Sequence, residues 1–215
     1  MRDGTDTARP AIPAPILETR VVAIGRNLPE AALSDVAAAL VAGGIRAFEL
    51  TLTTDGALDG IAALRRAWPE DRLLVGAGTV LDEAHAARAV EAGARFLVTP
   101  HLDPALIGWA AARGIACFPG AFTPTEVLAA WRAGAAAVKL FPASAAGPSF
   151  VREMRGPLPQ IPLVPTGGIT ADNAPAFIAA GAVAVGVGGW LTGGGDPALV
   201  RDRAAALIRA VATAT

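Results

Sequence analysis

The only lysine of this 215-residue chain, Lys139, lies in an apolar stretch, Ala137–Pro142, that has the character of a buried strand. Every other member of the 18 lysines and arginines is an arginine. Arginine serves as well as lysine in a salt bridge or against a phosphate, but only lysine can lose its proton near neutral pH and attack a carbonyl carbon as an amine. Lys139 is therefore a candidate nucleophile.

Two further charged residues, Arg26 and Glu49, also occur within apolar strand-like segments. Burying a charge without a partner is costly, so we expect Arg26, Glu49 and Lys139 to meet around one site. Because strand side chains alternate, Glu49 shares a face with Thr51, and Lys139 shares a face with Phe141. The alternative interpretations are a Glu49–Lys139 ion pair that only fixes the geometry of the fold, and Lys139 as a plain phosphate clamp.

The elements that carry these residues follow a repeating order in which a helix ends in glycine and a short apolar strand follows. This pattern predicts strands near residues 20–26, 46–52, 73–79, 95–100, 115–120, 136–142, 162–167 and 183–188. Strict alternation of strands and helices indicates a parallel sheet, and eight units favour an α/β (β/α)8 TIM barrel, with an open doubly wound sheet as the alternative. We expect one domain over residues 18–215 after a flexible leader over residues 1–17.

The carboxyl ends of barrel strands are where function collects. Glycine-rich turns follow the last two predicted strands, and loops at these places often bind phosphate through backbone N–H groups. The alternative is that these glycines only close tight turns. His101, after the fourth strand, is interpreted as a solvated loop histidine. The further strand-end residues that we expect to contact substrate or phosphate are Thr79, Pro100, Phe141, Thr166, Gly167, Gly168, Gly188 and Gly189.

Composition argues against several classes of protein. The formal net charge is −1 without a basic patch, which gives no support to nucleic-acid binding. There is no run of about 18 apolar residues that would span a membrane. The single cysteine, Cys117, excludes an intrachain disulfide, and no Cys/His cluster indicates zinc. No metal or other cofactor is expected. The first residues lack the pattern of a secretion signal, so we expect a cytoplasmic protein.

Four segments together resemble the 2-keto-3-deoxy-6-phosphogluconate aldolase family, which includes 4-hydroxy-2-oxoglutarate and phosphogalactonate aldolases. These segments are Glu49–Leu52, Val75–Leu81, Lys139–Ala143 and Pro165–Ile169. The Gly-Ala-Gly-Thr-Val and Lys-x-Phe-Pro parts are the more specific, and the resemblance covers nearly all of the chain after the leader. It implies a metal-free class I aldolase, typically a homotrimer, that cleaves a 2-keto-4-hydroxy acid phosphate into pyruvate and an aldehyde.

The resemblance also implies roles for individual residues. Lys139 matches the lysine that forms the Schiff base, and Glu49 matches the glutamate that shuttles protons. Arg26 and Thr79 match substrate-binding residues, while Gly167 and Gly168 match glycines that hold the phosphate. Two positions depart from the family: Gly189 stands where a serine is often found, and Thr53 where some relatives have arginine. Both concern the distal part of the substrate.

Three questions stay open at this level. The preferred substrate could be the phosphogluconate, the phosphogalactonate or hydroxyoxoglutarate. The glycine loops would also suit an isomerase or a thiamine-phosphate-synthase type of barrel without imine chemistry, or a non-catalytic barrel. For the pKa of Lys139, burial and Arg26 would lower it and Glu49 would raise it, so the sequence does not decide its direction.

Overall fold

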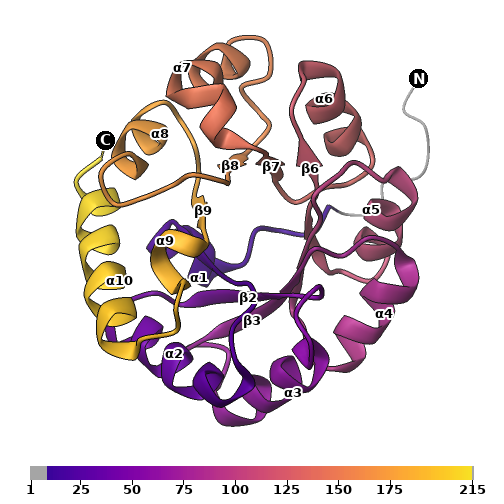
Figure 1. The fold of residues 1–215 in the computed structure, drawn as a ribbon. Helices are drawn as coiled ribbons and strands as arrows, with labels where there is room; N and C mark the ends of the chain where they lie inside the picture. The colour runs from indigo at the N-terminus through magenta and orange to yellow at the C-terminus, as the bar shows by residue number, and fades with distance from the viewer. Residues whose placement is uncertain (1–8, 215) are drawn as a thin grey trace.

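A computed structural model describes residues 9–214, in which a ring of parallel strands is surrounded by helices (Figure 1). The strands are β1 (Val21–Gly25), β2 (Ala47–Thr51), β3 (Leu74–Gly78), β4 (Phe96–Val98), β5 (Ala116–Phe118), β6 (Gly120–Ala121), β7 (Val138–Leu140), β8 (Leu163–Pro165) and β9 (Val185–Val187). The helices are α1 (Ala14–Thr19), α2 (Glu30–Ala42), α3 (Ala57–Ala67), α4 (Glu83–Glu91), α5 (Pro104–Ala111), α6 (Pro124–Arg132), α7 (Ala143–Arg155), α8 (Ala174–Ala179), α9 (Gly189–Thr192) and α10 (Pro197–Ala212).

The strands close into a barrel. One sheet has the order β5-β4-β3-β2-β1-β9, and a second has the order β6-β7-β8. Pro119 alone separates β5 from β6, and a parallel bridge between Thr166 and Gly186 joins β8 to β9. The fold is therefore a single-domain (β/α)8 TIM barrel, and the open doubly wound alternative is wrong. The fifth expected strand is divided because proline at position 119 has no N–H for a sheet ladder.

Side chains alternate between two cores, as the strand pattern predicts. Phe48, Leu50, Val138 and Leu140 are buried in the cluster shared with the surrounding helices. A separate cluster fills the barrel with residues that come mainly from the first half of each strand: Ile16, Val22, Ala47, Leu74, Phe96, Val98, Ala116, Phe118, Ala136, Ala137, Val164 and Ala184. The polar inward positions consequently lie above an apolar plug.

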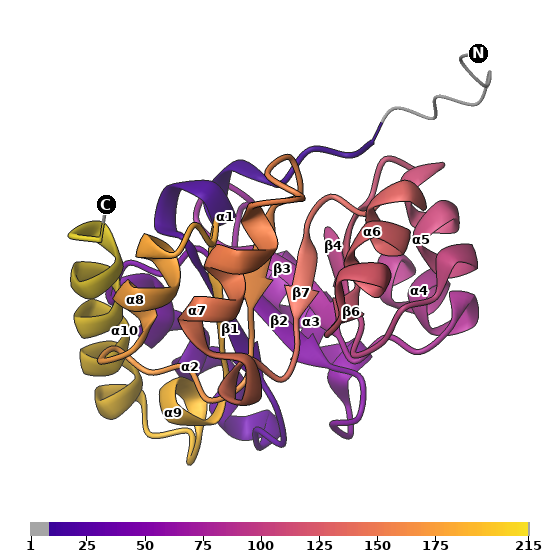
Figure 2. The ribbon, with the colours of Figure 1, turned by 90° about the horizontal axis from the view of Figure 1, so that it is seen from above.

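Helix α1 closes the amino end of the barrel and was not expected from the sequence. Its Ile16 is 0% exposed and packs with the first residues of the strands, Ala47 and Ala184 among them. Figure 2 shows α1 and α9 toward opposite ends of the barrel. The expected boundary between a flexible leader and the domain, at residue 17, falls inside this helix, so that boundary is corrected for residues 14–17. The part of the expected leader over residues 1–8 lies outside the described chain.

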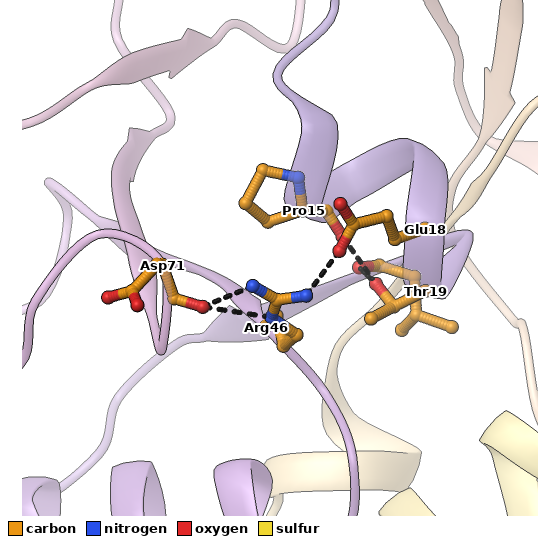
Figure 3. Close-up of polar contacts among 6 residues, drawn as sticks. Pro15, Glu18, Thr19, Arg46 and Asp71 are labelled. Atoms are coloured by element: carbon orange, nitrogen blue, oxygen red, sulfur yellow. Dashed lines mark hydrogen bonds and ion pairs between the residues drawn. The ribbon is translucent and has the colours of Figure 1, made fainter.

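Arg46, directly before β2, fastens α1 to the barrel (Figure 3). Its guanidinium pairs with the Glu18 carboxylate and donates two hydrogen bonds to the Asp71 carbonyl, one of them at 3.1 Å. Within α1, the Thr19 hydroxyl donates to the Pro15 carbonyl at 2.8 Å. The apolar contact of Ile16 is thus supported by polar contacts at the rim of the helix.

Side-chain caps fix the starts of several helices that follow strands. At α6, Thr123 and Glu126 form a reciprocal capping box. At α5, the Asp103 carboxylate accepts the N–H groups of Ala105 and Leu106. These caps satisfy backbone donors that the first turn of a helix leaves unpaired, so the loops at the carboxyl ends of the strands are well defined.

Candidate active site

Arg26, Glu49 and Lys139 line one cavity of about 390 Å³. Lys139 lies in β7 and Glu49 in β2, and Arg26 follows β1 directly. Residues that follow β8 and β9 complete the wall, so the cavity opens at the carboxyl ends of the strands. The structure therefore brings the three charged residues to one cavity as the sequence expects, but Arg26 is exposed and follows its strand, so the expected burial is wrong for Arg26.

Lys139 is 5% exposed and is held on both sides by the second sheet, opposite Gly120 in β6 and Val164 in β8. Burial lowers the pKa of the Lys139 ammonium below its ordinary value, Arg26 lowers it further, and Glu49 opposes both. Its Nζ lies 4.8 Å from the centre of the Phe141 ring. The direction of the pKa shift favours the neutral amine, which is the form that attacks a carbonyl.

Glu49 is 1% exposed, and burial raises the pKa of its carboxyl to about 7, although Lys139 and Arg26 each lower it. Among the groups of residues 9–214, its Oε2 atom has no hydrogen-bond partner. A carboxyl with a pKa near neutrality can both accept and return a proton under physiological conditions. Glu49 therefore has the properties of a general acid and base.

Gly78 on the neighbouring strand β3 makes room for this carboxyl. A Cβ atom at Gly78 would lie 2.6 Å from Oε1 of Glu49 and 2.8 Å from its Cδ. Such distances are far inside van der Waals contact, so a larger residue would displace the carboxyl group. The Gly-Ala-Gly segment of β3 thus has a direct steric function in the site.

Two glycine loops form part of the cavity wall. Gly167 and Gly168 follow β8 with φ of 100° and 74°, a region that suits glycine. Gly188 and Gly189 follow β9, and all four glycines line the cavity. Thr166 and Phe141 line it as well, and the Thr166 hydroxyl donates to the Val164 carbonyl at 3.3 Å. Trp190, Asn27 and Thr170 are further lining residues.

Thr79 and Pro100 are not among the lining residues of this cavity. Thr79 follows β3 in a left-handed conformation with φ of 56°, and Pro100 follows β4 with its carbonyl group tight against Gly120. His101 is half-buried and also lies outside the lining. The structure thus gathers the other predicted site residues, while these three stand at the ends of their strands beside the site.

A second cavity, of about 320 Å³, lies between the β2–α3 loop and α4. Its charged lining residues, Asp55, Asp59, His85 and Arg88, are exposed or half-buried. The buried charged groups Glu49 and Lys139 therefore distinguish the Lys139 cavity from this one. We take the Lys139 cavity as the candidate active site.

Comparison with known proteins identifies the family of this chain. A family model described as KDPG and KHG aldolase matches residues 12–206, where KDPG is 2-keto-3-deoxy-6-phosphogluconate and KHG is 4-hydroxy-2-oxoglutarate. The chain belongs to this aldolase family. It is accordingly a carbon–carbon lyase of the class I aldolase type.

Individual relatives of this aldolase agree with the family match. A probable 2-dehydro-3-deoxy-6-phosphogalactonate aldolase of Rhizobium meliloti is 38% identical over 93% of this chain and 94% of its own length. A solved structure described as native KDPGal matches with a TM-score of 0.86 at 31% identity, over 90% of this chain and 95% of the other. KDPG aldolase from Legionella pneumophila, solved with pyruvate captured as a covalent carbinolamine, matches with a TM-score of 0.77 at 26% identity, over 95% of this chain and 99% of the other.

A threonine network in this aldolase was not expected from the sequence. The Thr51 hydroxyl donates to the Gly25 carbonyl at 3.3 Å and lies 3.0 Å from the Thr54 hydroxyl. The Thr54 hydroxyl accepts the N–H of Asn27 at 3.0 Å. These contacts connect the strand of Glu49 to the loop of Arg26. The only sequence signal was Thr51 on the same face as Glu49, which does not reveal the partners.

Two features are absent from the described residues of this aldolase. They contain no group of three His, Cys, Asp or Glu side chains arranged to hold a metal ion. Across the same part of the chain, the helices are too short or too polar to cross a membrane.

Proposed function

We propose that this aldolase cleaves a 2-keto-4-hydroxy acid phosphate through a Schiff base on Lys139, with Glu49 as the proton shuttle. The observation that carries the proposal is a buried lysine beside a buried glutamate in one cavity, with the pKa of the lysine lowered and that of the glutamate raised. The covalent pyruvate adduct of the Legionella pneumophila relative supports the same chemistry.

The reaction begins at the substrate ketone. The neutral amine of Lys139 adds to C2 to give a carbinolamine, whose hydroxyl group takes up a proton from solvent and leaves as water, giving an iminium ion. The Glu49 carboxylate, directly or through a water molecule, takes the proton of the C4 hydroxyl. The C3–C4 bond then breaks, its electron pair moves into the iminium to form an enamine, and C4 departs as an aldehyde.

The second half of the reaction releases pyruvate. Glu49 returns its proton to C3 of the enamine, which restores the iminium of pyruvate, and water hydrolyses it to pyruvate and the free Lys139 amine. For 2-keto-3-deoxy-6-phosphogluconate the departing aldehyde is glyceraldehyde 3-phosphate. The proton that solvent supplies at dehydration is released again when the iminium is hydrolysed, so the steps balance with water and the two side chains.

The proposal places Arg26 against the anionic substrate and the two glycine loops against its phosphate. Arg26, Gly167 and Gly168 line the same cavity as Lys139, as do Gly188 and Gly189. Phe141 and Thr166 line the cavity as well and are proposed to contact the carbon chain. Thr79 and Pro100 remain proposed contacts that depend on substrate reaching beyond the present lining.

Reductive trapping tests the imine. We expect pyruvate and borohydride to leave a stable adduct on Lys139 that mass spectrometry of proteolytic fragments can locate. Lys139→Arg keeps the charge and removes the nucleophilic amine, so it should abolish the adduct and the aldolase activity while the circular dichroism spectrum stays native. Glu49→Gln should lower kcat by about 100-fold or more, in the range of lost acid–base catalysis, and still be trapped.

Absence of an adduct on the native enzyme would contradict the imine and favour a phosphate-binding barrel isomerase or synthase. Release of pyruvate from any 2-keto-4-hydroxy acid excludes a non-catalytic barrel.

The choice of substrate calls for a direct comparison. We propose 2-keto-3-deoxy-6-phosphogluconate as the substrate, with the phosphogalactonate and 4-hydroxy-2-oxoglutarate as the alternatives named by the family and by the Rhizobium meliloti relative. Values of kcat/KM for the three compounds decide among them. A preference for hydroxyoxoglutarate would show that the phosphate loops contribute no binding free energy.

We also propose that the aldolase is a homotrimer, which is the assembly that resemblance to its family implies. Light scattering on the purified protein should then give three times the 21.6 kDa chain mass. A mass equal to one chain at micromolar concentration would contradict the trimer without bearing on the imine chemistry.

A further inference from the structure

The side chain of Asn173 closes the glycine loop that follows β8. Its Oδ1 atom accepts the N–H of Thr170 at 2.9 Å, and its Nδ2 atom donates to the carbonyl of Gly168 at 2.9 Å. One partner is a donor and the other an acceptor, so a single orientation of the amide satisfies both. The loop is therefore tied to itself by one side chain at two points.

The side-chain contacts of Asn173 differ from those usual for an asparagine directly before a helix. The residue directly precedes α8, and asparagine at such a position commonly accepts an N–H from the first turn of its helix. Asn173 makes no side-chain hydrogen bond of that kind. The Asn173 amide therefore stabilises the loop and does not cap α8.

The two contacts orient backbone groups at the cavity wall. Gly168 and Thr170 both line the Lys139 cavity. The Gly168 carbonyl is engaged by Asn173, whereas the N–H groups of Gly168 and Ile169 donate to no acceptor within residues 9–214. Consecutive unpaired N–H groups in a glycine-rich turn form a seat for an anion. The Asn173 amide thus occupies the Gly168 carbonyl, while the N–H groups of Gly168 and Ile169 remain available to an anion.

We propose that Asn173 is a positioning residue for phosphate recognition, acting through the Gly167–Thr170 loop. The inference rests on the proposed function, because it takes the phosphate end of the substrate to lie against this loop. It goes further in naming the side chain that sets the loop geometry. Asn173 has no contact with Lys139 or Glu49 among its hydrogen bonds, so its influence should be confined to the phosphate.

Two substitutions test the role. Asn173→Leu keeps the size of the side chain and removes both hydrogen bonds, and Asn173→Asp keeps an acceptor for Thr170 but presents a carboxylate oxygen to the Gly168 carbonyl. We expect each to raise KM for 2-keto-3-deoxy-6-phosphogluconate about tenfold, the usual effect of losing one or two hydrogen bonds. Competitive inhibition by inorganic phosphate should weaken by about the same factor.

Two readouts separate this role from a purely structural one. The kcat/KM for 4-hydroxy-2-oxoglutarate, which has no phosphate, should stay within about twofold of the native value, and pyruvate should still be trapped on Lys139. As a matched control, Asp103→Ala removes two side-chain hydrogen bonds to backbone N–H groups at the start of α5, away from the cavity. It should lower stability without changing the ratio of KM values for the two substrates.

Different results would contradict the role of Asn173 and the proposed function. Equal losses on both substrates, or unchanged phosphate inhibition, would overturn the role of Asn173. A native enzyme that phosphate does not inhibit would overturn it too. Failure to trap pyruvate on the native enzyme would instead reject the proposed function. If Asn173→Leu does not fold, Asn173→Asp alone decides.

Discussion

Glu49 carries a carboxyl group whose ionisation the fold opposes. Its ordinary pKa of 4.5 rises to about 7, chiefly because burial removes water from the carboxylate. The unfolded chain therefore loses this proton at a lower pH than the folded chain. A raised carboxyl pKa means that stability is complete below pH 4.5 and declines as the pH rises through 7. Burial of the Glu49 carboxyl therefore lowers the free energy of unfolding at pH values above 4.5.

The first prediction concerns this cost. A shift of this size corresponds to about 3 kcal/mol, since one pKa unit is about 1.4 kcal/mol. Glu49→Gln cannot ionise, so its free energy of unfolding relative to the native enzyme should increase by up to about 3 kcal/mol between pH 4.5 and pH 8. Removing Glu49 also lowers the pKa of Lys139 further, which changes the difference in the same direction. Urea denaturation at several pH values measures it.

A constant difference between the two proteins over that range would contradict the raised pKa of Glu49. The rate should carry the same signature. The kcat/KM of the native enzyme should rise with pH through about 7 as Glu49 becomes the carboxylate base. Because ionisation of Lys139 also acts on this limb, the apparent pKa belongs to the coupled pair. The Glu49→Gln variant should lose the inflection near 7.

At the scale of elements, strand β3 makes room for the Glu49 carboxyl because Gly78 has no side chain. Gly78→Ala would place Cβ 2.6 Å from Oε1 of Glu49, and the atom that can yield is the end of a flexible side chain. We expect the barrel to form and the carboxyl to shift, with kcat lowered about 10- to 100-fold because small displacements of catalytic groups carry large losses. Steady-state kinetics and borohydride trapping measure the two effects separately.

Gly108→Ala is the control for this substitution. Gly108 lies inside α5, and a Cβ there would meet nothing within 4 Å. The change should leave activity unaltered and raise stability by about 0.5–1 kcal/mol, since alanine favours a helix over glycine. Full activity of Gly78→Ala would show that Glu49 has room to relax and that the tight contact is not required.

The short element after β9 supports a prediction about the phosphate. A Cβ at Gly189 would meet nothing within 4 Å, and Gly189 lines the cavity. Gly189→Ser should therefore be accommodated and should add a hydroxyl donor at the position where the resemblance to the family implies a serine. We expect KM for the phosphorylated substrate to fall several-fold, about one hydrogen bond in free energy, with no change for hydroxyoxoglutarate. Equal changes for both substrates would place the hydroxyl away from the phosphate.

Much of this arrangement could be predicted from the pattern of residues, and the exceptions have physical causes. Alternation placed Glu49 and Lys139 inside the barrel, because a side-chain period of two is a local property of a strand. The contacts of Thr51 with Gly25 and of Thr54 with Asn27 could not be predicted, since each depends on a hydroxyl meeting a backbone group that is distant in the sequence. The contacts of Asn173 are local, but an asparagine directly before a helix could equally have capped that helix.

At the scale of the whole molecule, the sequence predicts the ring of strands but not the helix α1 that closes its amino end. Eight βα units predict the ring, but a polar and proline-rich start predicted only a leader. A lone Ile16 in a six-residue helix gives too weak a periodic signal for an amphipathic helix. Its importance arises only when it joins the apolar cluster that fills the barrel. That environment is a property of the closed barrel, not of the segment.

The last prediction tests whether α1 is part of the domain. Ile16 is 0% exposed at the amino end of the barrel, whereas its neighbour Leu17 is 48% exposed. Ile16→Ala should lower the free energy of unfolding by about 2–5 kcal/mol, because it leaves a cavity among closely packed strands. Leu17→Ala should change it by no more than about 0.5 kcal/mol. Urea denaturation measures both, and similar small losses would favour the expected flexible leader over residues 1–17. Because Ile16 lies beneath the strands while Lys139 lines the cavity at their carboxyl ends, the Ile16→Ala enzyme should keep its native KM as long as it remains folded.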